Sequence, residues 1–143
     1  MQVSQIAQVP PPRVKPTAMV DEAVQAMQNA RGGAVVITDQ GRPTGMFTER
    51  DVLLRVVAAS KDPQTTLVRE VMTSSIESIS ADTEAIRALE MMVSRHIRHL
   101  PLVDAQGRLV GLVSMRNILL NYMDALRGGL EQGTGDKEHG TGN

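Results

Sequence analysis

The sequence contains no cysteine, no tryptophan, one phenylalanine and one tyrosine among its 143 residues. The absence of cysteine excludes disulfide bonds, thiolate metal sites and cysteine nucleophiles. With so few aromatic residues, the core has to be aliphatic, and nine methionines supply flexible side chains that fill irregular spaces. The scarcity of aromatic side chains beside basic ones also argues against binding of single-stranded nucleic acid.

Long apolar runs and a strong net charge are absent as well. No stretch approaches the roughly 18 apolar residues of a membrane span, and residues 1–12 lack the basic-then-apolar order of a signal peptide. The formal net charge is −1, so no overall field attracts nucleic acid or an anionic membrane. We therefore expect a cytoplasmic protein that binds neither nucleic acid nor membrane.

An internal repeat organises the chain. Residues 41–53 recur as residues 107–119 at a constant offset of 66 positions, with Gly, Arg, Gly, Arg and Leu identical. Upstream, Ala23–Met27 matches Ala88–Met92 at an offset of 65, so the second copy has gained one residue, which we place before His99. Self-similarity at a fixed spacing of this kind indicates a duplicated structural unit.

The two copies share one order of hydrophobic periodicities. Spacings of i, i+3, i+4 and i+7 predict helices, and short apolar runs predict buried strands. The expected elements are a strand at 13–15, a helix from Val20, strands at 34–38 and 44–48 and a helix from Arg50, repeated at 76–80, 86–93, 100–103, 110–114 and from Met115. The helix positions expected to be buried are Val20, Ala23, Val24, Met27, Val52, Leu53, Val56, Val57, Ile86, Leu89, Val93, Ile118, Leu119, Tyr122 and Met123.

This order predicts an α/β (α+β) fold made of two β-α-β-β-α units, residues 1–64 and 65–126. A unit below roughly 70 residues buries too little apolar surface alone, so we expect the units to pack through their sheets with pseudo-two-fold symmetry. Gly45 and Gly111 lie inside expected strands, where glycine marks either a β-bulge or the close approach of another segment. Residues 127–143 are glycine-rich and polar, which predicts a disordered tail.

The element Gly-h-h-[Thr/Ser]-x-x-[Asp/Asn], where h is hydrophobic, occurs at Gly45–Asp51 and at Gly111–Asn117. Together with the segment Ile97–Pro101, it resembles the CBS domain family, and the pair of copies resembles a Bateman module. The resemblance implies two clefts between the copies that bind AMP, ADP, ATP or a related adenosine compound, with no cofactor required. It also implies a homodimer that regulates a separate protein, here unknown.

Thr48 and Asp51 lie where the second strand of the first copy meets the following helix. A helix N-terminus favours phosphate, and a carboxylate accepts hydrogen bonds from both hydroxyls of a ribose. The resemblance implies that Asp51 holds the ribose and that Thr48 lies near the phosphates; alternatively, either residue simply caps the helix. Ser114 and Asn117 occupy these places in the second copy, and because Asn carries no charge, we expect the Asp51 cleft to bind more tightly.

Arg98 and His99 precede the second copy's central strand. The resemblance implies that they point toward the phosphates, where Arg offers a planar fork of donors and His adds charge at mildly acid pH. The first copy carries Gly32 and Gly33 at that place, just after Arg31, and so departs from the pattern at one phosphate-binding arm. The alternative is a solvated basic turn.

The adenine needs a flat apolar slot. By the same resemblance, the expected linings are Ile76, Ile79 and Ile97 for the Asp51 cleft, and Val14 and Gly33 for the Asn117 cleft. Apolar residues at such places are alternatively plain core.

Other chemistry finds little support in the sequence. His96 and His99 are three apart but lack a third ligand, so we expect no metal site. No nucleophile–base–acid motif and no Walker-type loop is present, so we expect no enzyme activity. The competing interpretation is a structural dimerisation or protein-interaction module that has lost nucleotide binding, and it is favoured by Asn117 and by the Gly32–Gly33 pair.

Overall fold

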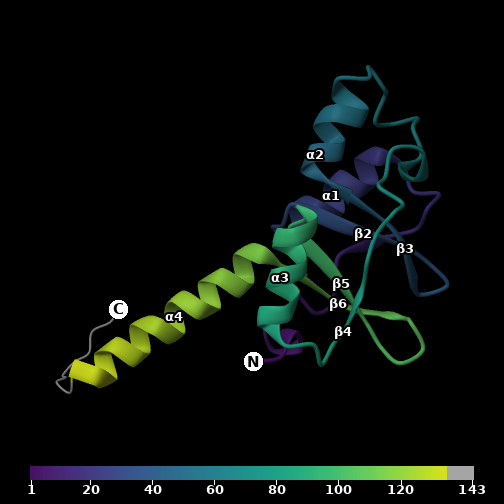
Figure 1. Ribbon diagram of the computed structural model, residues 1–143. Helices are drawn as coiled ribbons and strands as arrows, with labels where there is room; N and C mark the ends of the chain where they lie inside the picture. The colour runs from purple at the N-terminus through teal and green to yellow at the C-terminus, as the bar shows by residue number, and fades with distance from the viewer. Residues whose placement is uncertain (135–143) are drawn as a thin grey trace.

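The computed structural model describes residues 1–134 and contains two mixed three-stranded sheets (Figure 1). In the first half, β2 (Ala34–Asp39) pairs in parallel with β1 (Arg13–Val14) and antiparallel with β3 (Arg42–Thr48). In the second half, β5 (His99–Val103) pairs in the same way with β4 (Ile79–Ser80) and β6 (Leu109–Ser114). The predicted tandem arrangement of β-α-β-β-α units is confirmed.

The first helix of each half, α1 (Val20–Ala30) and α3 (Ala85–Arg95), covers its own sheet through a stripe of small and flexible residues. The buried positions are Val20, Ala23 and Met27 in α1, and Ala85, Ala88 and Met92 in α3. The predicted burial of Ile86 and Val93 is wrong, because these side chains are 49% and 61% exposed. The two stripes have the same spacing.

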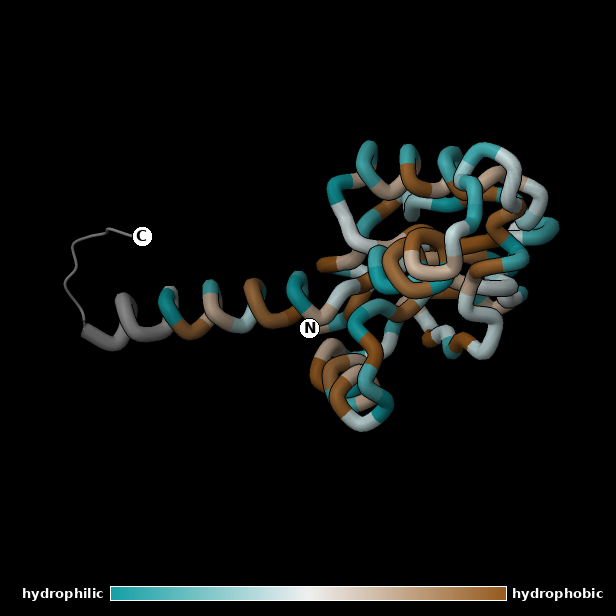
Figure 2. Tube along the Cα trace, turned by 90° about the horizontal axis from the view of Figure 1, so that it is seen from above, coloured by the Kyte–Doolittle hydropathy of each residue, from teal (hydrophilic) through white to brown (hydrophobic). Residues whose placement is uncertain are grey.

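The second helix of each half contributes little to the core. In the first half, α2 (Glu49–Asp51) continues into the π-helix η2 (Val52–Val57), of which Val56 is buried. In the second half, α4 (Met115–Thr134) projects away from the sheets (Figures 1 and 2). The predicted burial of Leu53, Val57, Leu119 and Met123 is therefore wrong within one chain, where these side chains are between 44% and 63% exposed.

The length of α4 also corrects the predicted tail. The helix continues to Thr134, so disorder from residue 127 onward is wrong for residues 127–134, and residues 135–143 lie outside the described residues. Once a helix is nucleated, each further residue adds a backbone hydrogen bond. This propagation tolerates Gly128 and Gly129 despite a cost of about 1 kcal/mol each. No helix within residues 1–134 combines the length and hydrophobicity needed to span a membrane.

Each half contributes its leading segment to the core of the other half. Val3, in η1 (Val3–Gln5), packs among Ala85, Ala88 and Met92, whereas η3 (Val68–Glu70) packs against α1. Equivalent hydrogen bonds hold the two segments: Val3 N to Thr83 O at 2.9 Å and Val68 N to Ala18 O at 2.8 Å, then Ala85 N to Met1 O at 2.8 Å and Val20 N to Thr66 O at 2.9 Å. Because each bond in one half has a counterpart in the other, the two halves are related by the predicted pseudo-two-fold symmetry.

The sheets face each other through a third cluster of buried side chains, as predicted. The cluster comprises Ala34, Val36, Met46, Leu109 and Leu112. The hairpins also touch at their tips, where Leu109 N donates to Gly41 O at 2.8 Å and Arg42 donates to the carbonyl of Gln106.

Strand register corrects the position of the gained residue. Ala34 pairs with Thr48, and His99 pairs with Ser114. The second copy therefore gains its residue in the turn between β5 and β6, where a loop tolerates an insertion, and not before His99. It follows that Arg98 is the counterpart of Gly33, and His99 the counterpart of Ala34.

Both interpretations of the strand glycines hold at Gly45. Its partner strand shifts register between Ile37 and Thr38, which is a bulge. A Cβ at Gly45 would also overlap the sulfur of Met72, which follows η3 in the leading segment of the second half. At Gly111 the neighbours are less crowded, with Ala7 3.4 Å from the corresponding position.

Candidate functional site

Two cavities open along the seam between the halves. The Asp51 cavity has a volume of about 1110 Å³, and its lining includes Thr48, Asp51, Thr73 and Ile97. The Asn117 cavity, of about 1300 Å³, is lined by Ser114 and Asn117 among others. Both volumes exceed the roughly 300–1,000 Å³ of a typical ligand pocket, so each cavity has room for a nucleotide.

Five residues line both cavities: Gly33, Glu49, Arg98, His99 and Met115. We call this set the shared wall. It brings together the start of β5, the start of α4 and the start of α2, so residues from both copies separate the cavities.

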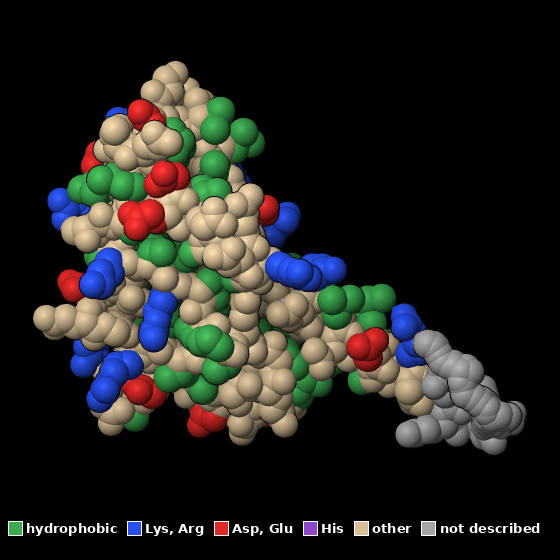
Figure 3. Space-filling model, turned by 180° about the vertical axis from the view of Figure 1, so that it is seen from behind, with side chains coloured by type: hydrophobic (Ala, Val, Ile, Leu, Met, Phe, Trp, Pro, Cys, Tyr) green, Lys and Arg blue, Asp and Glu red, His purple; other side chains and the backbone are tan. Residues whose placement is uncertain are grey.

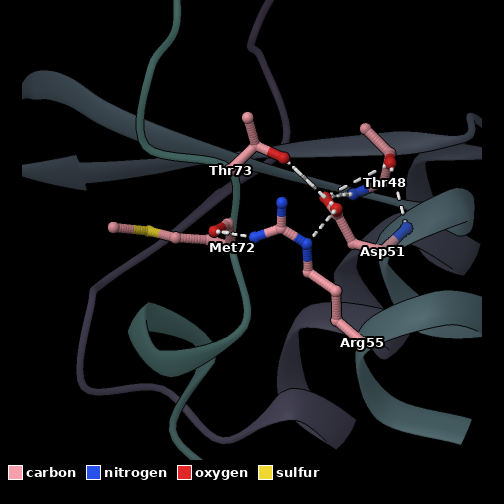
Figure 4. A network of polar contacts seen from close by, with 5 residues as sticks. All are labelled: Thr48, Asp51, Arg55, Met72 and Thr73. Atoms are coloured by element: carbon pink, nitrogen blue, oxygen red, sulfur yellow. Dashed lines mark hydrogen bonds and ion pairs between the residues drawn. The ribbon is translucent and has the colours of Figure 1, made fainter. Parts of the chain in front are cut away.

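The Asp51 carboxylate is buried, with 6% exposure, and lies at the centre of a polar network (Figure 4). Its Oδ2 accepts hydrogen bonds from Thr48 N at 3.1 Å and from Thr48 Oγ1 at 3.3 Å, and Thr48 Oγ1 in turn accepts from Asp51 N. The Thr73 hydroxyl donates to both carboxylate oxygens at 3.2 and 3.3 Å. This reciprocal pairing of Thr48 with Asp51 is a capping box at the start of α2.

Arg55 completes the network from the next turn. Its Nε lies 3.5 Å from Asp51 Oδ1, and its Nη1 donates to Met72 O at 3.0 Å. Because Met46 and Thr73 also exchange backbone hydrogen bonds at 2.9 and 2.8 Å, the Asp51 network joins the first copy to the segment that enters the second.

The second copy does not reproduce this network. Asn117 N donates to Ser114 Oγ at 3.1 Å, which caps α4. The counterpart of Thr73 is Gln8, and its Nε2 donates to Ala30 O at 3.0 Å, not to Asn117. The Asn117 cavity therefore has no carboxylate at the position of Asp51.

The shared wall carries charge of both signs. The Glu49 side chain lies over Gly33, where an added Cβ would be 2.7 Å from Glu49 Oε1. Arg98 is exposed and His99 is half-buried. Burial lowers the pKa of His99 below its usual value and Arg98 lowers it further, whereas Glu49 opposes this shift. Neutral imidazole is thus favoured at neutral pH.

The CBS domain family model matches the chain twice, over residues 3–58 and 68–124. The chain belongs to the CBS domain family. The CBS domain-containing protein YhcV of Bacillus subtilis is 36% identical to it over 110 residues, which cover 77% of each protein. An uncharacterized protein of Methanopyrus kandleri is 34% identical over 100 residues, which cover 70% of this chain and only about half, 51%, of that protein.

Solved structures agree with this assignment. A CBS domain protein from Pyrobaculum aerophilum, complexed with AMP, superposes with a TM-score of 0.72 at 29% identity. The match covers 87% of this chain and 99% of that one. The tandem CBS fold is therefore shared over nearly the whole described chain.

The CBS pair brings most of the predicted site residues to its cavities. The Asp51 cavity contains Thr48, Asp51, Ile76, Ile97, Arg98 and His99, and the Asn117 cavity contains Gly33, Arg98, His99, Ser114 and Asn117. Two predicted residues lie elsewhere: Ile79 belongs to the core under α3, and Val14 packs against the core under α1. Both side chains point inward from short strands and line neither cavity, and their place in an adenine slot stays a prediction.

Sequence reasoning did not identify Glu49, Arg55 and Thr73 in this CBS pair. Glu49 and Arg55 are two and four positions from Asp51 in the sequence, so their place near the site could have been predicted from the motif. Thr73 had none, because its contact with Asp51 depends on the exchange of leading segments.

Proposed function

We propose that this CBS pair is a regulatory module that binds an adenosine nucleotide, namely AMP, ADP or ATP, in the Asp51 cavity and acts as a homodimer on a separate cytoplasmic protein. The observation that carries the proposal is a buried carboxylate on the wall of a cavity of nucleotide size. A carboxylate accepts two hydroxyl hydrogen bonds at once, which suits the diol of a ribose. The module is proposed to bind its ligand without chemical turnover.

Ribose binding at Asp51 replaces one hydroxyl donor by another. The Thr73 hydroxyl already donates to both carboxylate oxygens, and a ribose hydroxyl is a donor of the same kind. Replacing one hydroxyl by another leaves the buried charge satisfied, so no desolvation penalty for an unpaired group opposes binding. The displaced Thr73 hydroxyl is half-buried and can turn toward solvent in the open cavity.

The remainder of the ligand has matching chemistry in the same cavity. Ile76 and Ile97 are half-buried apolar side chains suited to the base. Arg98, exposed on the shared wall, offers a fork of donors for a phosphate. The AMP complex of the related protein from Pyrobaculum aerophilum supports an adenosine ligand for this chain.

A homodimer is supported by apolar side chains that the single chain leaves uncovered. They are Leu53, Leu54, Val57, Leu119, Leu120, Met123 and Leu126, with exposures between 41% and 69%. They lie on the two helices that the pseudo-symmetry relates, and Figure 3 shows hydrophobic side chains on the projecting α4. A second copy is the fitting occupant, because a two-fold partner presents the same two helices and covers both sets together.

One observation favours the second candidate, a structural interaction module without nucleotide. Asp51 has a complete set of partners within the chain, as a helix cap requires. In that case Asp51 serves only to join α2 to the connecting segment.

Titration calorimetry with AMP, ADP and ATP tests the choice. We expect saturable binding of at least one of them, recovery of the nucleotide unchanged, and about tenfold or greater weakening in Asp51→Asn, which removes the charge. Asn117→Ala is the matched control in the second copy and should retain the affinity. No binding of any of the three, or equal affinity in Asp51→Asn, would favour the structural module.

A further inference from the structure

The second helices of the two halves present matching rows of apolar side chains, but the rows differ in length. The α4 row consists of four residues that are between 41% and 69% exposed, namely Leu119, Leu120, Met123 and Leu126. Their counterparts in the first copy are, in the same order, Leu53, Leu54, Val57 and Ser60. The first three of these counterparts form the η2 row. At the fourth position the repeat has a leucine in α4 and a serine in the first copy.

The first copy stops its helix at the position where α4 continues. Ser60 has a left-handed backbone, with a φ of 56°, and η2 ends at Val57. A left-handed residue does not continue a right-handed helix, and the exposed polar residues Lys61 and Asp62 follow. By contrast, α4 runs to Thr134 and projects past the sheets (Figure 2). Leu126 therefore lies on a part of α4 that the rest of the chain leaves largely uncovered.

The α4 row has the spacing of a seam between two paired helices. Leu119, Met123 and Leu126 follow one another at intervals of four and three residues, as apolar residues do where one helix packs along another. From position 119 to position 126 the helix rises by roughly 10 Å. A surface that covers this row must be apolar over the same length. The η2 row is shorter and ends in a polar turn, whereas a second α4 row matches it along its whole length.

We infer that the homodimer joins the two chains through their second halves, with the α4 row of one chain packed against the α4 row of its partner. This inference rests on the proposed homodimer and adds its orientation. In this arrangement Leu126 meets apolar side chains of the partner's α4. In the reverse arrangement, in which α4 faces the partner's first half, Leu126 meets the polar turn at 60–62. Because burial of apolar surface is favourable in proportion to its area, the first arrangement is the more stable.

The orientation also determines which cavities are neighbours in the dimer. Leu119 and Leu120 line the Asn117 cavity, and Leu54 lines the Asp51 cavity. Pairing of the two α4 rows therefore brings both Asn117 cavities to one end of the dimer and both Asp51 cavities to the other. A target protein that binds at one end then contacts one type of cavity.

Engineered cysteines test the orientation, because the natural chain contains no cysteine. Met123 and its counterpart Val57 are 51% and 63% exposed, so cysteine at either position leaves the core intact. A disulfide forms only where two Cα atoms come within about 7 Å. Under mild oxidation we expect Met123→Cys to form a covalent dimer with itself. An equimolar mixture of Met123→Cys and Val57→Cys should give mixed dimers only as a minor product, which mass spectrometry distinguishes. The control Val9→Cys, at a position that is 66% exposed outside both rows, should remain non-covalent.

A second variant tests the α4 row itself. Leu126→Ser gives α4 the residue of the first copy and removes one leucine from the interface in each chain. We expect its dimer dissociation constant, measured by sedimentation equilibrium, to rise at least about tenfold. The matched control Val9→Ser changes an equally exposed apolar residue outside both rows and should leave the constant unchanged.

Three results would overturn the inference: mixed dimers as the main product, no covalent dimer of Met123→Cys although the chain sediments as a dimer, or an unchanged dissociation constant in Leu126→Ser. A natural chain that sediments as a monomer would instead count against the proposed homodimer, so the two failures are distinguishable.

Discussion

The hydroxyl of Thr73 lies 3.2 and 3.3 Å from the two carboxylate oxygens of Asp51 and donates to both. Thr73 belongs to the segment that connects the halves, and Asp51 lies in the first turn of the second helix of the first half (Figure 4). A ligand that takes the place of Thr73 therefore breaks a contact between the halves as it binds. Because a ligand shifts an equilibrium only by its differential affinity for the two states, this exchange is a physical route from binding to a changed arrangement.

Replacing Thr73 with valine tests the exchange. The variant keeps the shape of the side chain but removes the competing donor, so we expect AMP to bind several-fold more tightly. The lost hydrogen bond to a charged group should lower the free energy of unfolding by about 1.5–3 kcal/mol. Calorimetry measures the first effect and urea unfolding the second. Weaker binding, with the fold intact, would show that Thr73 holds the ligand and does not compete with it.

Gly45 is expected to accept a side chain only if Met72 moves. In Gly45→Ala the new methyl group overlaps the sulfur of Met72, and because methionine is flexible the loss of stability should lie near the lower end of the about 1–3 kcal/mol that overpacking costs. Gly111→Ala is the matched control, since its closest neighbour is 3.4 Å away. In the double variant Gly45→Ala/Met72→Ala the overlap is gone, so the two losses of stability in urea should be less than additive. Additive losses would place the strain elsewhere.

His99 should make stability depend on pH. Burial lowers its pKa in the folded chain relative to about 6.5 when unfolded. Between these two values the unfolded state binds more protons, so stability rises with pH through this window and falls as the pH drops below about 6.5. Urea unfolding at pH 5.5 and 7.5 should show this slope, reduced in His99→Gln. The control His96→Asn should keep it, and an unchanged slope in His99→Gln would refute the assignment.

The exposed apolar helices should carry the homodimer. Val57 and Leu126 are 63% and 69% exposed, so glutamate at either position leaves the single chain's core unaltered. We expect sedimentation velocity to report a dimer for the natural chain and a monomer for Val57→Glu/Leu126→Glu. The control Val9→Glu changes a side chain that is 66% exposed but lies far from α2 and α4 in the chain, and should stay dimeric. A monomeric natural chain would exclude the homodimer.

The repeat predicted the order of elements and their symmetry because periodicity reports which face of each element is buried. It did not predict which apolar residues of the second helices are buried: Val57 and Leu119 match the pattern as well as Val56 and Ile118 do. An apolar stripe indicates a covered face without indicating whether the cover comes from the same chain. The gained residue was also misplaced, because both positions fit the sequence equally well and only strand register distinguishes them.

For the site, the motif located Thr48 and Asp51, and the pairing of the copies brought Arg98 and His99 to the same cavity. The motif did not predict that the glutamate side chain of Glu49 lies beside Gly33, whose counterpart in the second copy is Arg98. Glu49 fits there because glycine has no side chain at the position that faces the first turn of α2. Thr73 is a similar case, since its contact with Asp51 follows from the exchange of leading segments between the halves.

A crystal structure of the chain grown with AMP tests the central claim most directly. We expect one nucleotide in the Asp51 cavity, with ribose oxygens about 3 Å from the Asp51 carboxylate and with the Thr73 hydroxyl withdrawn from it. A structure in which AMP lies away from Asp51, or in which Asp51 keeps both contacts with Thr73 at saturating AMP, would contradict the claim.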